Sequence, residues 1–229
     1  MGVITRSFPP HPNPLPPGER VRHSSPQHSW GVFWHILINL LRRGLEESSK
    51  VNENIHKVRD SMDNIRIYPD PILRRKAKPV ENIDGRVKQI ADRMAEVMYA
   101  CKGIGLAAPQ IGIPNQIIVV DIGEARKALI NPEIVEGEGE TIMEEGCLSL
   151  PTVEVPVKRM ERVLVRAWNL DGKELTLELF GFPGRVYQHE IDHLHGILII
   201  NYLSRLKREL LIKRMLKDLK QSQKQGSIL

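Results

Sequence analysis

Hydrophobic residues recur at intervals of three and four positions after Asp84, with charged residues between them. This spacing places the apolar side chains on one face of a helix, and aspartate is a residue type that caps helix N-termini. The pattern therefore predicts an amphipathic helix with a buried face, on which Cys101 is a core thiol. That face consists of Val87, Ile90, Ala91, Met94, Val97, Met98 and Cys101.

Shorter segments further along the chain predict strands. Residues 116–121 and 129–135 are short runs rich in β-branched and apolar side chains. In residues 162–167 and 173–180, apolar side chains occupy every second position. Residues 169–172, Asn-Leu-Asp-Gly, have the composition of a tight turn, so the last two segments predict a β-hairpin.

Two helices are expected in the C-terminal part. One begins near Pro183, which suits a first helical turn, and runs to about His195 before Gly196. The other extends from about Leu203 to Leu219, where Leu206, Leu210, Met215 and Leu219 can line one face. Several short strands with two or three helices between them predict an α+β fold.

Residues 1–61 differ from the rest of the chain. Seven of the sixteen prolines fall between Pro9 and Pro26, and such a segment forms neither helix nor central strand. The apolar run from Trp30 to Leu41 is too short to span a bilayer. We expect a disordered extension or a start codon assigned too far upstream, with an organelle transit peptide as the alternative, and residues 62–229 as the working domain.

The composition agrees with one soluble domain, because 41% of the 229 residues are hydrophobic and 27% are charged. Cys101 and Cys147 are the two cysteines of the chain, which excludes a disulfide framework and favours a reducing compartment. We therefore expect a cytoplasmic protein that does not enter a membrane. The net charge is +5, which suits an anionic partner but does not identify one.

The segment from His189 to His193 has the pattern His-Glu-x-x-His. On a helix, the two histidines project from one face and can bind the same metal ion, and Glu190 lies beside that ion as a general base. A helix with two ordinary histidines and a solvated glutamate is the alternative.

A catalytic metal needs a third protein ligand. Ile199 occupies the position where one class of zinc peptidases has a third histidine, and His195 points to another side of the helix. Glu209 is an alternative ligand, but it lies in a basic and solvent-facing pattern. Cys147 is the better candidate, because Gly146 beside it allows close backbone approach and a metal would hold its sulfur as thiolate.

Three segments together resemble the peptide deformylase family. They are Gly103-Ile-Gly-Leu-Ala-Ala-Pro-Gln110, Glu145-Gly-Cys-Leu-Ser149 and Gln188-His-Glu-Ile-Asp-His193, in the order of the family's three motifs. The resemblance begins near Ile65 and leaves residues 1–61 outside. It implies antiparallel strands packed around a central metal-binding helix, followed by the C-terminal helix. It also implies a hydrolase of protein biosynthesis that removes the formyl group from the N-terminal formylmethionine of new proteins.

The resemblance also implies a role for each matching residue. Cys147, His189 and His193 would bind one divalent ion, with Fe2+ expected and Zn2+, Ni2+ or Co2+ as alternatives. Metal-bound water would attack the formyl carbonyl, with Glu190 as general base and then acid. The oxyanion would be stabilised by the Gln110 side chain and the Leu148 N–H. The residues expected to contact the peptide are Gly105, Gly146, Ile104 and Phe182.

Two other functions are also compatible with the sequence. The His-Glu-x-x-His pattern by itself also suits a metallopeptidase that cleaves internal bonds. A ribosome-binding or RNA-binding protein with a structural metal is suggested by the basic last helix, although a solvated surface explains the same charges. The expected partners are formylated nascent peptides, and the ribosome through that helix, for a monomeric enzyme. We also expect Asp192 to pair with Arg166 or Arg159.

Overall fold

The computed structural model of the protein describes residues 65–224. The extension expected at residues 1–61 lies outside the described residues, and so does its apolar run from Trp30 to Leu41. No helix within residues 65–224 is long and apolar enough to cross a membrane. The elements are η1 (Pro71–Arg74), α3 (Gly85–Ala100), β1 (Gly105–Ala107), η2 (Ala108–Ile111), β2 (Ile117–Val120), β3 (Lys127–Glu138), β4 (Thr141–Cys147), β5 (Leu150–Arg159), β6 (Arg162–Trp168), β7 (Glu174–Phe180), α4 (Gly181–Leu194), η3 (Ile199–Tyr202) and α5 (Arg205–Lys224).

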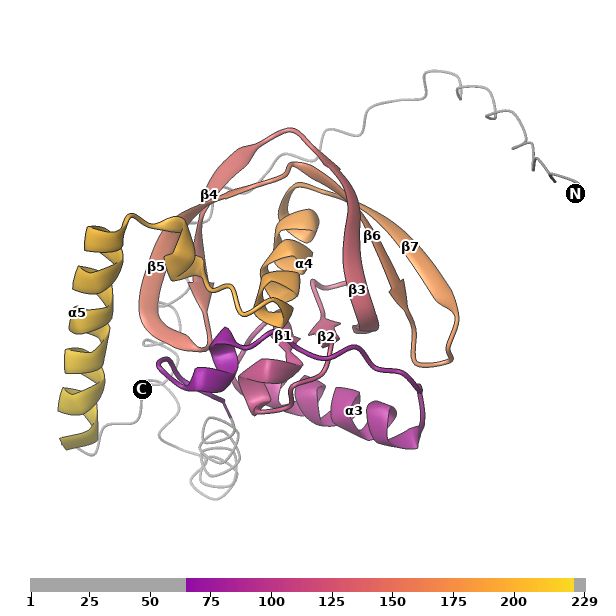
Figure 1. The fold of residues 1–229 in the computed structure, drawn as a ribbon, viewed down its shortest axis with the longest axis horizontal. Helices are drawn as coiled ribbons and strands as arrows, with labels where there is room; N and C mark the ends of the chain where they lie inside the picture. Colours follow the sequence, from indigo (N-terminus) through magenta and orange to yellow (C-terminus); the bar gives the residue numbers. More distant parts are fainter. Residues whose placement is uncertain (1–64, 225–229) are drawn as a thin grey trace, which may run out of the picture. The chain divides into compact units, whose positions relative to one another are not determined.

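The strands form two antiparallel sheets within these residues. The larger sheet has the order β1-β2-β3-β6-β7, and β4 pairs with β5 in a separate two-stranded sheet. Helix α4 lies between the two sheets, and α5 lies beside β5 (Figure 1). Strands and helices are thus mixed along the chain around antiparallel sheets, which confirms the expected α+β class.

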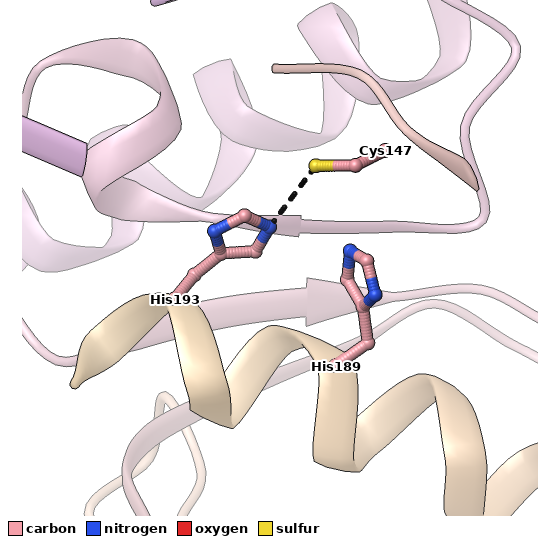
Figure 2. Close-up of side chains that lie close together, drawn as sticks. All are labelled: Cys147, His189 and His193. Atoms are coloured by element: carbon pink, nitrogen blue, oxygen red, sulfur yellow. Dashed lines mark hydrogen bonds between the residues drawn. The ribbon is translucent and has the colours of Figure 1, made fainter. Parts of the chain in front are cut away.

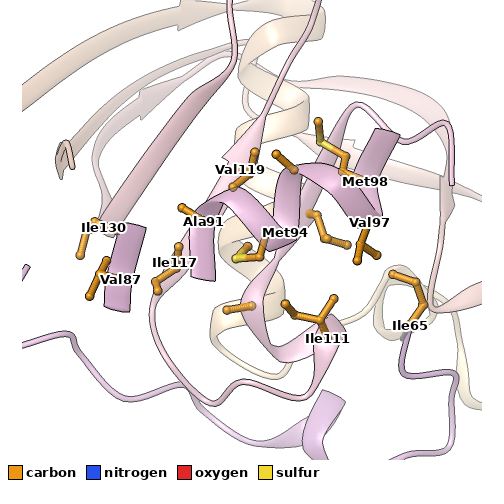
Figure 3. Close-up of a cluster of buried hydrophobic side chains, with 13 residues drawn as sticks. Ile65, Val87, Ala91, Met94, Val97, Met98, Ile111, Ile117, Val119 and Ile130 are labelled. Carbon is orange, nitrogen blue, oxygen red and sulfur yellow. The ribbon is translucent and has the colours of Figure 1, made fainter. Parts of the chain in front are cut away.

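Helix α3 begins where the apolar periodicity predicts. The side chain of Asp84 accepts hydrogen bonds from the backbone N–H groups of Arg86 at 2.9 Å and Val87 at 3.2 Å, which satisfies two donors that a helix start leaves free. The apolar face packs on the larger sheet. Figure 3 shows this core, in which Met94 from α3 lies with Ile117 from β2.

The predicted hairpin is the β6–β7 pair. Val163, Val165 and Ala167 are buried, and the turn is closed by Asn169, whose side chain accepts from the backbone N–H groups two and four residues later. Strands β2 and β3 agree with the other two predicted segments, although β3 continues to Glu138. These outcomes follow from side-chain alternation, which is a local signal.

Strands β4 and β5 were not predicted. Strand β5 does alternate, because Val153, Val155 and Val157 are buried, but Pro156 lies among them and proline argues against a strand interior. Strand β4 has exposed apolar side chains and a buried glutamate, Glu145, which is the reverse of the usual pattern.

The last helix exists, but the face predicted for it is partly wrong. Leu206 and Leu210 are 67% and 61% exposed, whereas Met215 is buried as expected. Strand β5 meets the helix further along, so the packed side chains lie around Met215 instead of extending to the first turn. The helix side chains in this contact are Leu211, Ile212, Met215, Leu216 and Leu219.

Candidate metal centre and active site

Helix α4 carries both histidines of the His-Glu-x-x-His pattern. It begins at Gly181, has Pro183 in its first turn and ends at Leu194, close to the predicted boundaries. The rings of His189 and His193 have their centroids 5.0 Å apart, as the four-residue spacing on one helix face requires.

Cys147 reaches the same place from the two-stranded sheet. It is the last residue of β4, and the pairing of β4 with β5 is irregular immediately before it: Gly146 pairs with Glu154, whereas Cys147 pairs with Leu150. The Sγ atom of Cys147 lies 3.3 Å from Nε2 of His193 (Figure 2).

The potential ligand atoms of Cys147, His189 and His193 all lie within 4.8 Å of one another. Within residues 65–224 this is the one group of three or more such side chains with that geometry. A thiolate with two imidazoles suits Zn2+, Fe2+ and related ions. Three protein ligands also leave a coordination position open, which is typical of catalytic and not of structural sites.

The other candidate ligands lie elsewhere. His195 is exposed, and its Nδ1 lies 2.9 Å from the carbonyl oxygen of Ile191. Glu209 is exposed on α5 and pairs with Arg205 at 2.9 Å. Neither residue belongs to the three-residue group.

The two rings differ in their electrostatics. Burial holds the pKa of His193 well below its usual value, so this ring is neutral and can be a ligand. Burial also opposes a charge on His189, but the neighbouring Cys147 and Glu145 outweigh it and raise the pKa of His189 well above the usual value. The pocket thus favours a positive charge beside Cys147, a condition that a bound cation would also satisfy.

Glu145 fixes the orientation of His189. Its Oε2 lies 2.9 Å from Nδ1 of His189, and its carboxylate also accepts hydrogen bonds from Arg159 and Arg185. Burial raises the pKa of Glu145, but His189 and Arg159 more than reverse this and lower it to about 2. An ionised carboxylate at this position accepts a hydrogen bond from the Nδ1–H group of His189, which keeps the proton on Nδ1 and leaves Nε2 available for a ligand role.

Glu190 is enclosed and lies against the backbone of β1. Burial raises its pKa to about 7, and its Oε2 is buried without a hydrogen-bond partner among the described residues. A Cβ atom added to Gly105 would lie 2.4 Å from Oε1 of Glu190. Only glycine leaves room at this position, because the Glu190 carboxylate occupies the space where a side chain of residue 105 would lie.

Gln110 directs its amide group into the site. Its Oε1 accepts a hydrogen bond from the backbone N–H of Ala107 at 2.8 Å, which fixes the side chain. Its Nε2 then points to Cys147 Sγ at 3.7 Å and Ser149 Oγ at 3.3 Å. Leu148 follows Cys147 in the turn between β4 and β5.

The residues expected to contact a peptide differ in their burial. Ile104 is half-buried and packs on the core beneath α4, and Phe182 is 40% exposed in the first turn of α4. Gly146 has open space where a side chain would be, because the nearest atom to a built Cβ is a carbonyl oxygen at 3.9 Å.

Sequence reasoning missed the buried charges that support the group. Glu145 and Arg159 were noticed, the first as part of a motif and the second as a partner of Asp192, but no role at the site was assigned to them. Arg185 was not singled out. All three are at most 6% exposed, and a charged residue inside an apolar pattern, such as Arg185 before Val186, is the signal that could have found them.

The comparisons with known proteins point to the peptide deformylase family. The sequence model of the polypeptide deformylase family matches residues 62–209. A peptide deformylase of Thermotoga neapolitana is 49% identical over 156 residues, which are 68% of this chain and 95% of that protein. One from Dictyoglomus thermophilum is 53% identical over 137 residues, 60% of this chain and 90% of that protein.

Solved structures give the same result. A crystal structure of a peptide deformylase from Legionella pneumophila is similar with a TM-score of 0.66 and 41% identity, over 69% of this chain and 95% of that chain. The enzyme from Thermus thermophilus is similar with a TM-score of 0.64 and 43% identity, over 71% of this chain and 98% of that chain.

Proposed function

This chain belongs to the peptide deformylase family and removes the formyl group from N-formylmethionyl peptides, and we propose that Cys147, His189 and His193 hold the metal ion of this reaction. The observation that carries the proposal is the convergence of one thiol from β4 and two imidazoles from α4 within 4.8 Å. A divalent ion bound there supplies Lewis acidity toward a carbonyl oxygen and makes a water molecule more acidic. On this view α4 is the central metal-binding helix of the domain formed by residues 62–229.

Glu190 performs the proton transfers in this proposal. Its pKa of about 7 is close to the working pH of a cytoplasmic enzyme, which suits a group that must both accept and donate a proton. Glu190 takes a proton from the attacking water as the C–O bond forms, and it gives that proton to the amine nitrogen as the C–N bond breaks. The products are formate and a peptide with a free N-terminus.

Gln110 and the backbone N–H of Leu148 are proposed to stabilise the oxygen that gains charge. The support for Gln110 is its fixed geometry, because the bond from Ala107 leaves only the Nε2 end facing Cys147. A donor held in advance at the position of a developing negative charge can contribute about 10²–10³ in rate.

The peptide is proposed to lie as an added strand. Strand β1 is at the edge of the five-stranded sheet, and β4 pairs only with β5 among the described strands. Gly105 is in β1 and Gly146 is in β4, so both edges next to the site can offer backbone groups to an extended peptide. Ile104 and Phe182 are proposed to contact the methionine side chain.

The ion is proposed to be Fe2+, with Zn2+, Ni2+ or Co2+ able to replace it, because a thiolate with two imidazoles suits all four. The test is to purify the protein without oxygen, measure its metal content, and incubate it with an N-formyl-Met tripeptide. Formate plus the intact free-amine tripeptide is the expected result. Cleavage within the peptide would support a metallopeptidase instead, and no product with any of the four ions would support a binding role.

The outer face of α5 is proposed to contact the ribosome. It carries exposed Lys207, Lys213, Lys217 and Lys220 beside the exposed side chain of Leu210, and clustered bases bind RNA phosphates in a salt-dependent manner. The double variant K213E/K217E should no longer sediment with ribosomes at low salt.

A matched control for that experiment is K88E/K173E, which reverses two exposed lysines outside α5 and should still sediment. Equal sedimentation of both variants would remove the proposed contact. A cytoplasmic location and a monomeric state complete the proposal. The free thiols of Cys101 and Cys147 support the first, and gel filtration tests the second.

A further inference from the structure

A continuous chain of hydrogen bonds leads from His189 to the protein surface. His189 Nδ1 lies 2.9 Å from Oε2 of Glu145, and Glu145 is held by Arg159 through two bonds of 3.0 Å. The far side of the Arg159 guanidinium donates to Asp192 at 2.5 Å and to the hydroxyl of Tyr202 at 3.0 Å. Tyr202 itself donates to Asp192 at 2.7 Å.

Arg159 is the rigid link in this chain. Its guanidinium is planar, so the Nε and Nη2 atoms that hold Glu145 cannot move independently of the Nη1 atom that faces Asp192 and Tyr202. The side chain is 3% exposed, and the guanidinium carbon lies 5.0 Å from the centroid of the Tyr202 ring. A tilt imposed at the Tyr202 side is therefore transmitted to the carboxylate of Glu145.

Tyr202 belongs to the segment that leads into α5. It is the last residue of η3, and α5 starts at Arg205. Arg208, in the first turn of α5, donates to the carbonyl oxygens of Ile200, Asn201 and Leu203 at 2.9 to 3.2 Å. The start of α5 and the backbone around Tyr202 are thus tied together.

The tyrosine is also accessible. It is 42% exposed and lines a groove of about 830 Å³ together with Met160 and Gln188. The catalytic steps proposed above do not use the side chains of Tyr202, Met160 or Gln188. The hydrogen bonds of Tyr202 therefore have a role other than direct catalysis.

We infer that Tyr202 is a positioning residue of the active site, which fixes His189 through Asp192, Arg159 and Glu145 and thereby couples the start of α5 to the metal ligands. The inference rests on the proposed role of His189 as a ligand. Loss of the Tyr202 hydroxyl removes one acceptor of Arg159 and one donor to Asp192. The guanidinium is then held on its outer side by Asp192 alone, and the acceptor of the His189 Nδ1 proton is less well fixed.

The test compares Tyr202→Phe with Tyr99→Phe. Both variants delete one hydroxyl that donates to an aspartate, since Tyr99 donates to Asp121 at 2.6 Å, and Tyr99 is likewise largely exposed at 49%. The readout is the dissociation constant of Co2+ from the metal-free protein, measured by competition with a chelating dye. Direct outer partners of a ligating histidine change metal affinity by about 10–100-fold, so the more distant Tyr202→Phe should weaken Co2+ binding by about 3–10-fold.

The control Tyr99→Phe should leave Co2+ binding unchanged. Equal affinities for wild type and Tyr202→Phe would overturn the inference, and so would an equal loss in both variants, because that would reflect general destabilisation. The variant His189→Ala separates this failure from a failure of the proposed ligand. If His189→Ala binds Co2+ as wild type does, the ligand assignment is wrong. If only His189→Ala is impaired, the positioning role alone is wrong.

The coupling to α5 has its own test. Arg208→Gln breaks the tie between α5 and η3 and should weaken Co2+ binding in the wild-type background. In the Tyr202→Phe background the same substitution should have little further effect, because both act through one path. If the changes in Co2+ binding free energy of the two single variants add fully in the double variant, α5 is not coupled to His189 through Tyr202.

Discussion

The contact between Gly105 and Glu190 gives the sharpest prediction. In Gly105→Ala the new Cβ would lie 2.4 Å from Oε1, 2.9 Å from Cδ and 3.0 Å from Cγ of Glu190. Ordinary contacts of a Cβ begin at 3.4 Å, so the carboxylate must move by about 1 Å. Glu190 is 4% exposed and has little space to move into.

A displacement of about 1 Å in a catalytic group can cost about 100-fold in rate, or about 2.7 kcal/mol of transition-state stabilisation. We therefore expect kcat of Gly105→Ala on an N-formyl-Met tripeptide to fall about 100-fold with the metal content unchanged. Overpacking should also destabilise the fold by about 1–3 kcal/mol, measured by urea unfolding.

Two control variants test whether the contact with Glu190 causes these losses. Gly85→Ala adds the same methyl group at a site with no atom within 4 Å and should leave kcat unchanged. In a Glu190→Ala background the carboxylate is gone, so the stability cost of Gly105→Ala should largely disappear. If Gly105→Ala keeps wild-type kcat, or if its stability cost is the same with and without Glu190, the contact does not have the role given to it here.

Three further predictions concern the ligands and the charges. Cys147→Ser should lose most of its bound metal while Cys101→Ser keeps it, and equal metal contents in plasma emission analysis would remove Cys147 from the ligand set. Glu190→Gln should keep its metal and lose turnover, so residual kcat near wild type would exclude Glu190 as the base. Glu145→Gln leaves Arg185 without a carboxylate partner among the described residues and Arg159 with Asp192 alone, and should cost about 3–5 kcal/mol at pH 7. Because the pKa of Glu145 is lowered from 4.5 to about 2, the stability from its ionised form is present above pH 4.5 and is lost as the pH falls toward 2. The free energy of unfolding of the metal-free wild type, measured in urea, should therefore fall more steeply over that pH range than that of Glu145→Gln. Parallel pH dependences of the two proteins would contradict the lowered pKa of Glu145.

The elements that the sequence predicted are those with a local signal. The start of α3 depends on Asp84 and on a repeat of three and four residues, and the β6–β7 hairpin depends on alternation around a four-residue turn. The helix α4 was located because His189 and His193 fall at helical spacing and Pro183 and Gly196 mark its ends. Each of these features lies within about 20 residues of chain, so no knowledge of distant partners is needed.

The rest depends on contacts between distant segments. Glu145 can be buried because Arg159 from β5 and Arg185 from α4 donate hydrogen bonds to its carboxylate. Nothing near Glu145 in the sequence indicates that these two residues are its partners. Of the two arginines expected for Asp192, Arg159 is the partner, while Arg166 is exposed and pairs with Glu133. The exposure of Leu206 likewise depends on where β5 meets α5 and not on the helix itself.

The origin of the three proposed ligands has a kinetic consequence. Cys147 comes from a sheet of only two strands, whereas both histidines come from a helix packed against the larger sheet. A bound ion would therefore add a cross-link between β4 and α4, beside the ion pairs of Glu145 with Arg185 and of Arg159 with Asp192. Its residence time would be set by how often the β4–β5 unit detaches from α4, and amide hydrogen exchange in β4 would slow in proportion to the concentration of free metal.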